Sequence, residues 1–289
     1  MCVDLIMTLE EKINAIEIFN DPVINSLIVE GKTDSIIYNK VIEDANLSDI
    51  EFDVVIAENK NEVLKFLKKK TDLNFIMILD TDLDRYYNRI IENDRVLYTH
   101  YYTLENYLVL PEVIDIASRY FSSRNNPYKD GNTILNYIYT NIHDFVLFYI
   151  ANNYYGWGIS FEKRSVGKYD FHINLKIDKE KLREDFEKCK SEKSISSDFN
   201  WDEFDKIYSN LTNSYNVNEL FNGKITFDAV YFYFSNKYPT IMCNRNKNIF
   251  KADLAKYFIN SPEGKEFGCQ LKSKMQKYFQ VKTAKEIYA

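Results

Sequence analysis

The sequence predicts an α/β protein in which a parallel sheet with flanking helices precedes a mostly helical, aromatic-rich C-terminal region. Short apolar runs alternate with amphipathic stretches over the first 110 residues. Such a strand–helix–strand series forms a parallel sheet with right-handed crossovers. The chain also has 23 Tyr and 20 Phe among its 289 residues, so much of its core must be aromatic. Only 8 Gly and 5 Pro argue against a turn-dense all-β sandwich.

The strands of the first region, predicted as a domain over 1–110, are read from their apolar runs. Residues 75–79 are apolar without a break, which is too short for a helix and suits a strand buried on both faces. The predicted strands are 24–29, 52–57, 75–79 and 95–100. Helical spacing of apolar residues predicts helices over 3–19, 36–42 and 60–70.

Residues 111–289 are predicted to form a mostly helical C-terminal region that could complete an active site. Within it, the alternation of Phe171, Ile173, Leu175 and Ile177 predicts one strand. The predicted helices are 113–121, 134–150, 179–190, 199–211, 252–260 and 265–279.

Charge and cysteine usage narrow the class of protein. The net charge of −6 gives no overall basic field, so a nucleic-acid enzyme would need a local basic patch, a divalent metal or a partner. The four cysteines are scattered and form no C-x-x-C pair, which argues against a zinc ribbon. We see no signal peptide and no apolar run near the roughly 18 residues of a membrane span, so we expect a cytoplasmic protein without membrane contact.

Acidic residues follow two of the predicted strands. Glu30 ends the 24–29 run, and Asp80, Asp82 and Asp84 follow 75–79. The carboxyl ends of parallel strands share one edge of a sheet, so these side chains should converge there. Their mutual repulsion requires a cation, and Mg²⁺ is bound through carboxylates. A solvated acidic turn explains 80–84 alone, but acids at two strand ends favour a functional site.

These residues carry a family resemblance. V-E-G-K-T-D at 29–34 and I-L-D-T-D-L-D at 78–84 resemble the Toprim domain, the metal-binding fold shared by topoisomerases, primases and OLD nucleases. The E-G-x-x-D form is closest to the OLD-like branch, whose Ser/Thr-x-Glu motif is matched by residues 103–105. The surrounding Y-Y-T-L-E-N-Y-L resembles standalone Toprim effectors of bacterial anti-phage systems such as PARIS. The resemblance covers roughly residues 24–110.

The resemblance implies a site that binds Mg²⁺ or Mn²⁺. Glu30 would also be catalytic, and Lys224 after Gly223 would be the catalytic lysine, with Lys168 after Gly167 as the alternative. The implied metal ligands are Glu30, Asp34, Asp80, Asp82 and Glu105, with Asp84 and Thr103 as accessory residues. Thr103 is equally suited to cap a helix.

The expected function is that of a metal-dependent endonuclease, acting on DNA or RNA, with tRNA among the candidates, in anti-phage defence. Two metal ions would clamp the attacking and leaving oxygens of the phosphodiester. Gly31-Lys32-Thr33 follows a strand and not a phosphate-binding loop, so this chain shows no ATPase, and the resemblance implies a separate ABC-type ATPase partner. A homodimer would suit a small enzyme that grips a duplex. The alternative is an inactive Toprim-like scaffold that binds a protein partner.

Overall fold

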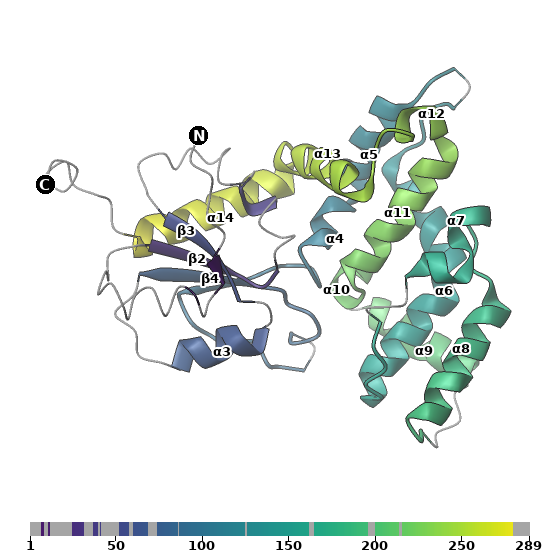
Figure 1. Cartoon of the computed structure of the whole chain (residues 1–289), viewed down its shortest axis with the longest axis horizontal. Helices are drawn as coiled ribbons and strands as arrows, with labels where there is room; N and C mark the ends of the chain where they lie inside the picture. Colours follow the sequence, from purple (N-terminus) through teal and green to yellow (C-terminus); the bar gives the residue numbers. More distant parts are fainter. Residues whose placement is uncertain are drawn as a thin grey trace, which may run out of the picture. The chain divides into compact units, whose positions relative to one another are not determined.

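The protein divides into two compact units, which are described separately. The α/β unit comprises residues 1–100 and 258–289, and the helical unit comprises residues 101–257 (Figure 1). The structure is a computed structural model, and it describes residues 7–8, 11, 25–31, 37–39, 41, 52–57, 60–68, 74–85, 87–124, 126–161, 165–195, 200–213 and 216–279.

The α/β unit is built on a parallel sheet, which confirms the predicted α/β class. The strand order is β1-β3-β2-β4-β5, and every neighbouring pair is parallel. The strands are β1 (Met7–Thr8), β2 (Asn25–Val29), β3 (Phe52–Ile56), β4 (Phe75–Leu79) and β5 (Val96–Tyr98). The last four lie where the apolar runs predict them. The helix predicted over 3–19 is wrong at Met7 and Thr8, because these residues extend the sheet by pairing with β3.

Helices pack on the central strands. All five residues of both β2 and β4 are buried, as expected for strands covered on both faces. Val63 of α3 (Lys60–Lys68) is buried in a core cluster with Val55 and Met77, and Leu64 and Leu67 pack against that cluster. Figure 1 shows α3 and α14 (Pro262–Tyr278) on opposite sides of the strands.

The division into units differs from the predicted one, 1–110 and 111–289, at two places. The first unit ends at His100, and the C-terminal segment returns to it. The reason for the return is the apolar stripe of α14, because Phe267, Leu271 and Met275 are buried and recur every four residues along one face of the helix.

The helical unit confirms the prediction of a mostly helical, aromatic-rich region. Its aromatic core includes Phe121, whose ring centroid lies 5.5 Å from that of Phe234 and 6.1 Å from that of Phe250.

None of the helices that the structure describes is both long and apolar enough to cross a membrane. The helices are α4 (Glu105–Leu108), α5 (Pro111–Phe121), α6 (Gly131–Tyr155), a 3-10 helix (Val166–Tyr169), α7 (Phe171–Asn174), α8 (Lys179–Glu192), α9 (Trp201–Thr212), α10 (Val217–Leu220), α11 (Gly223–Lys237), α12 (Pro239–Met242) and α13 (Lys247–Ile259), whose last two residues belong to the α/β unit.

The strand predicted around 171–177 is wrong. Residues Phe171–Asn174 form the single turn α7, and Leu175 follows it with a left-handed φ of 53°. Phe171 and Leu175 are buried while Ile173 is 57% exposed. Apolar residues four apart satisfy both the alternation of a strand and one turn of helix, so the pattern itself does not distinguish the two.

Close packing at the start of α6 yields a stability prediction. A Cβ added at Gly131 would lie 1.8 Å from the carbonyl oxygen of Pro111 and 2.9 Å from the backbone nitrogen of Asp115. We expect Gly131→Ala to lower the free energy of unfolding by about 1–3 kcal/mol or more, because α5 must move to admit the methyl group. Urea denaturation measures the change, with the exposed neighbour substituted in Asn132→Ala as the control. Equal stability of the two variants would contradict this packing.

Candidate functional site

Two of the predicted acidic residues meet at the carboxyl edge of the sheet. Glu30 follows β2 and Asp80 follows β4, and these strands are parallel neighbours. The Oε1 atom of Glu30 accepts a hydrogen bond of 2.8 Å from the backbone nitrogen of Asp80, 50 residues further along the chain. The structure therefore brings Glu30 and Asp80 together, as expected for the ends of adjacent parallel strands.

The turn after β4 is anchored to the end of β5. The backbone nitrogen of Thr81 donates to Oγ1 of Thr99 at 2.9 Å, and the nitrogen of Asp84 donates to the carbonyl of Thr81 at 3.0 Å. Asp82 adopts a left-handed φ of 50°, which Asp tolerates better than most residues. This geometry holds Asp82 and Asp84 in one tight turn beside the sheet edge.

Lys60, which the sequence interpretation missed, lies among these acids. Its Nζ atom is 3.2 Å from Oδ2 of Asp82 and 2.7 Å from Oδ2 of Asp84, and it also donates to the carbonyl oxygen of Asp80. Burial lowers the pKa of Lys60, but the charges of Asp82, Asp84 and Glu30 outweigh that effect and raise the pKa above its usual value. Lys60 is the first residue of the helix that follows β3. A residue that closely follows a parallel strand is expected at the carboxyl edge of the sheet, so the position of Lys60 could have been predicted from the sequence.

The fit of a divalent metal to this arrangement is incomplete. Carboxylate and carbonyl oxygens are the donors that Mg²⁺ prefers. Within the part of the chain that the structure describes, however, no three Asp, Glu, His or Cys side chains are grouped so as to hold a metal ion. Asp82 and Asp84 are paired with Lys60, and Asp34 lies outside the described residues. The chemistry of the donors suits the metal, but their arrangement around Lys60 does not form a metal centre.

The remaining predicted residues belong to the helical unit, beginning with Thr103. Its backbone nitrogen and its hydroxyl both donate to Oδ1 of Asn106, at 2.8 and 3.2 Å. The residue that caps α4 is Leu104, and no side chain caps this helix. The interpretation of Thr103 as a helix cap is therefore wrong, and its hydroxyl serves to fix Asn106.

Glu105 forms a buried ion pair with Lys251, a second lysine that the sequence interpretation missed. Oε1 of Glu105 lies 2.9 Å from Nζ of Lys251, and the two side chains are only 3% and 8% exposed. Burial raises the pKa of Glu105. The positive charges of Lys251 and Lys224 lower the pKa by more than burial raises it, so the net shift is downward. The Oε2 atom is buried and has no hydrogen-bond partner in the described part of the chain.

The two candidate catalytic lysines have different surroundings. Lys224 lies in the first turn of α11, and its positive charge lowers the pKa of Glu105. A Cβ at the preceding Gly223 would lie 2.4 Å from the backbone nitrogen of Asn106, so only glycine lets α11 pack this closely on α4. Lys168 instead pairs with Asp185 at 2.7 Å. The geometry therefore favours Lys224 over Lys168 as a partner of Glu105.

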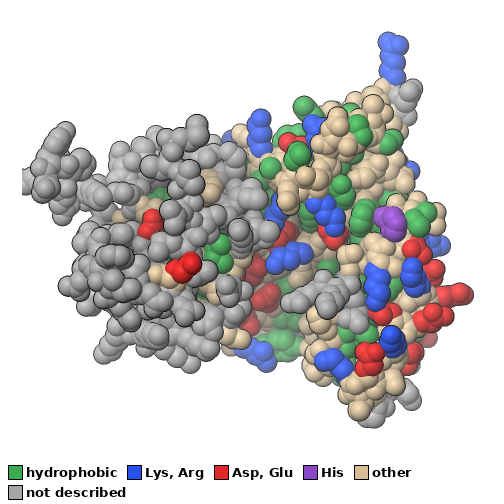
Figure 2. Space-filling view, in the orientation of Figure 1, with side chains coloured by type: hydrophobic (Ala, Val, Ile, Leu, Met, Phe, Trp, Pro, Cys, Tyr) green, Lys and Arg blue, Asp and Glu red, His purple; other side chains and the backbone are tan. Residues whose placement is uncertain are grey.

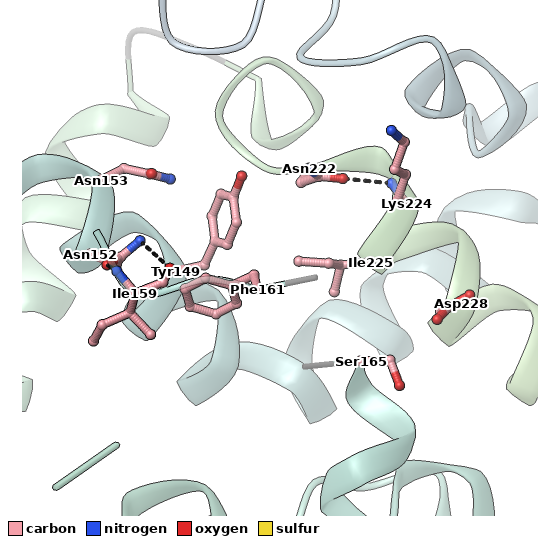
Figure 3. A pocket seen from close by; sticks show the side chains of 10 residues that line it. All are labelled: Tyr149, Asn152, Asn153, Ile159, Phe161, Ser165, Asn222, Lys224, Ile225 and Asp228. Atoms are coloured by element: carbon pink, nitrogen blue, oxygen red, sulfur yellow. Dashed lines mark hydrogen bonds between the residues drawn. The ribbon is translucent and has the colours of Figure 1, made fainter. Parts of the chain in front are cut away.

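Lys224 also lines a pocket of about 440 Å³ in the helical unit (Figure 3). Tyr149 and Phe161 form an aromatic wall, with ring centroids 4.9 Å apart. The side chain of Asn152 forms two hydrogen bonds with the backbone of Ile159, which also lines the pocket. The volume is in the range of small-molecule sites. The lining residues are Tyr149, Asn152, Asn153, Ile159, Phe161, Ser165, Asn222, Lys224, Ile225 and Asp228.

Charges of both signs are interspersed over the face of the helical unit visible in Figure 2. Charged side chains of the helical unit also form exposed or half-exposed pairs, such as Lys181 with Asp170 at 3.1 Å and Lys247 with Asp228 at 2.7 Å. On that face, the side chains that the structure describes form no broad basic patch. Attraction of a nucleic acid to this face would therefore depend on local charges or on a partner.

Comparison with known proteins adds no assignment to this geometry: no protein-family model and no curated protein matches the sequence.

Proposed function

We propose that this chain is a Toprim-like nuclease that cleaves DNA or RNA phosphodiesters with the help of Mg²⁺ or Mn²⁺. The observation that carries the proposal is the contact between Glu30 and Asp80 at the carboxyl edge of adjacent parallel strands. That edge is where open α/β sheets place their ligands. The motifs at 29–34 and 78–84 resemble those of Toprim nucleases, and Glu30 of the first motif and Asp80 of the second lie at this edge.

In this proposal Glu30 is the acid–base group. The hydrogen bond from the Asp80 backbone orients its carboxylate, and such a group moves protons in phosphodiester hydrolysis. The bound metal would supply charge neutralisation of the phosphate. Lys224 would stabilise negative charge on the substrate, and Glu105 with Lys251 would keep that part of the helical unit in place. The setting we propose is anti-phage defence, under the control of an ABC-type ATPase partner.

The test is a cleavage assay with purified protein. We expect plasmid DNA or total tRNA to be cut in the presence of Mg²⁺ or Mn²⁺, and cleavage to stop when EDTA removes the metal. Cutting that persists in EDTA would overturn the metal dependence. If neither nucleic acid is cut, the assay is repeated with an ABC-type ATPase isolated together with the chain, and inactivity of that complex would count against the nuclease.

A catalytically inactive scaffold is the second candidate, and a specific observation favours it. Lys60 and Lys251 pair with two of the predicted metal ligands, Asp82 and Glu105, and Lys60 also pairs with the accessory residue Asp84. A ligand that binds only the folded state raises its stability, so thermal unfolding distinguishes the two functions. A metal-dependent enzyme should gain several degrees in Tm from millimolar Mn²⁺, whereas a scaffold should gain none.

A further inference from the structure

The pocket of the helical unit has the form of a site for a small ligand. Its volume of about 440 Å³ is large enough for a molecule and not only for a stray side chain. Apolar and polar side chains both line it, so a matching ligand has an apolar face and a hydrogen-bonding edge. Figure 3 shows that α6 provides one side and the start of α11 the other, with Tyr149, Asn152 and Asn153 facing Asn222, Lys224 and Ile225.

Phe161 offers a fixed aromatic surface to this pocket. Its ring packs edge to face against those of Phe145 and Tyr149, with centroids 5.6 and 4.9 Å away, and its centroid lies 5.1 Å from that of Phe148. These three neighbours are buried, whereas Phe161 is half-buried and keeps part of its surface open. Every nucleobase has a π-face that stacks on an aromatic side chain of this kind.

Asn222 supplies hydrogen-bond donors to the same pocket. Its Oδ1 atom accepts a hydrogen bond of 2.9 Å from the backbone nitrogen of Lys224, which holds the side chain in place as the N-cap of α11. The amide nitrogen carries two N–H donors and has no acceptor among the residues that the structure describes. Side-chain amides of this kind recognise the edges of nucleobases.

We propose that this pocket binds a nucleotide, with the base stacked on Phe161 and hydrogen-bonded by the amide of Asn222. Lys224 lines the same pocket, so it would meet the phosphate of the bound nucleotide. The role of the pocket as a substrate site rests on the proposed nuclease function. A base turned out of a strand into this pocket would bring its phosphate to the lysine that stabilises negative charge on the substrate.

The experiment measures binding by isothermal titration calorimetry in EDTA. The probes are ribonucleoside monophosphates and short single-stranded RNA and DNA of mixed sequence. Phe161→Leu keeps an apolar side chain without the π-face, and Asn222→Asp keeps the capping oxygen without the N–H donors. We expect each variant to bind at least about fivefold more weakly than the parent. The control is Asn216→Asp, which makes the same change at the N-cap of α10, outside the pocket, and should bind as the parent does.

The two kinds of probe distinguish the sources of the nucleotide. Binding of the strands, weakened in both variants, supports a base of the substrate as the occupant, whereas binding of the monophosphates alone supports a free nucleotide. No binding of any probe by the parent, or parent-like binding by either folded variant, would overturn the inference. If Phe161→Leu loses the parent Tm, Asn222→Asp decides.

Failure of the pocket and failure of the nuclease give different results. A parent that cuts nucleic acid in Mg²⁺ but binds no probe through Phe161 and Asn222 would lose only the nucleotide pocket. A parent that binds a nucleotide there but cuts nothing, alone or with its partner, would lose only the proposed nuclease.

Discussion

Replacing Glu30 by alanine is expected to abolish nucleic-acid cleavage while the α/β unit stays folded. The carboxylate is the acid–base group of the proposed reaction, and general acid–base groups typically contribute about 10²–10⁴-fold to the rate. Glu30 is half-buried at the end of β2 and not in the sheet interior, so its loss removes no core packing. Initial cleavage rates, measured on whichever nucleic acid the parent cuts, should fall at least about 100-fold.

Two matched variants separate the chemistry from the structural role of Glu30. Glu30→Gln keeps an oxygen that can accept the hydrogen bond of the Asp80 backbone, but it removes the negative charge and the proton-transfer group. We expect it to be as inactive as Glu30→Ala and to match the parent in Tm. Glu92→Ala removes an exposed carboxylate of the same unit and should leave the rate unchanged. Cleavage by Glu30→Gln at the parent rate would remove Glu30 from the mechanism.

The second large effect is expected from Lys251→Met in the helical unit. This substitution keeps the bulk of the side chain but leaves the buried carboxylate of Glu105 without its cation. Breaking a buried ion pair on one side costs about 3–5 kcal/mol of unfolding free energy, because the remaining charge is uncompensated. Urea denaturation at pH 7 measures the loss. The control on the same helix is Lys247→Met, whose pair with Asp228 is partly exposed and should contribute about 0–1 kcal/mol.

The pH dependence of the loss identifies its cause. In the parent, the lowered pKa of Glu105 means that its contribution is complete above the usual carboxyl pKa and is lost as the pH falls through the folded value. Without Lys251, burial should raise the pKa of Glu105 in the folded variant. The free energy of unfolding of the variant should then fall as the pH rises, because the buried carboxyl group must lose its proton. The stability gap between parent and variant should therefore widen from pH 4 to pH 7. The double variant Glu105→Gln with Lys251→Met should recover most of the loss. A gap that does not change with pH would indicate lost packing instead of charge.

The sequence by itself determined the parallel sheet and the meeting of Glu30 with Asp80. Both follow from local patterns. Short apolar runs define the strands, and the carboxyl ends of parallel strands lie at one edge of the sheet independently of how the remaining residues fold. The mostly helical character predicted for the region after residue 110 followed from apolar spacing in the same way. Where one pattern fits two structures, as at Phe171 and Leu175, local spacing did not suffice.

Only the tertiary structure decided which cations accompany the acids. Glu105 and its partner Lys251 are 146 residues apart, and no local pattern links them. That the charge of Lys224, and not that of Lys168, acts on Glu105 depended likewise on the packing of α11 against α4 at Gly223. A lysine side chain is long and flexible, so its partner is set by where the helices pack and not by its neighbours in the chain. The same holds for Lys60, whose pairing with Asp82 and Asp84 is shown by the structure and was not predicted from the sequence.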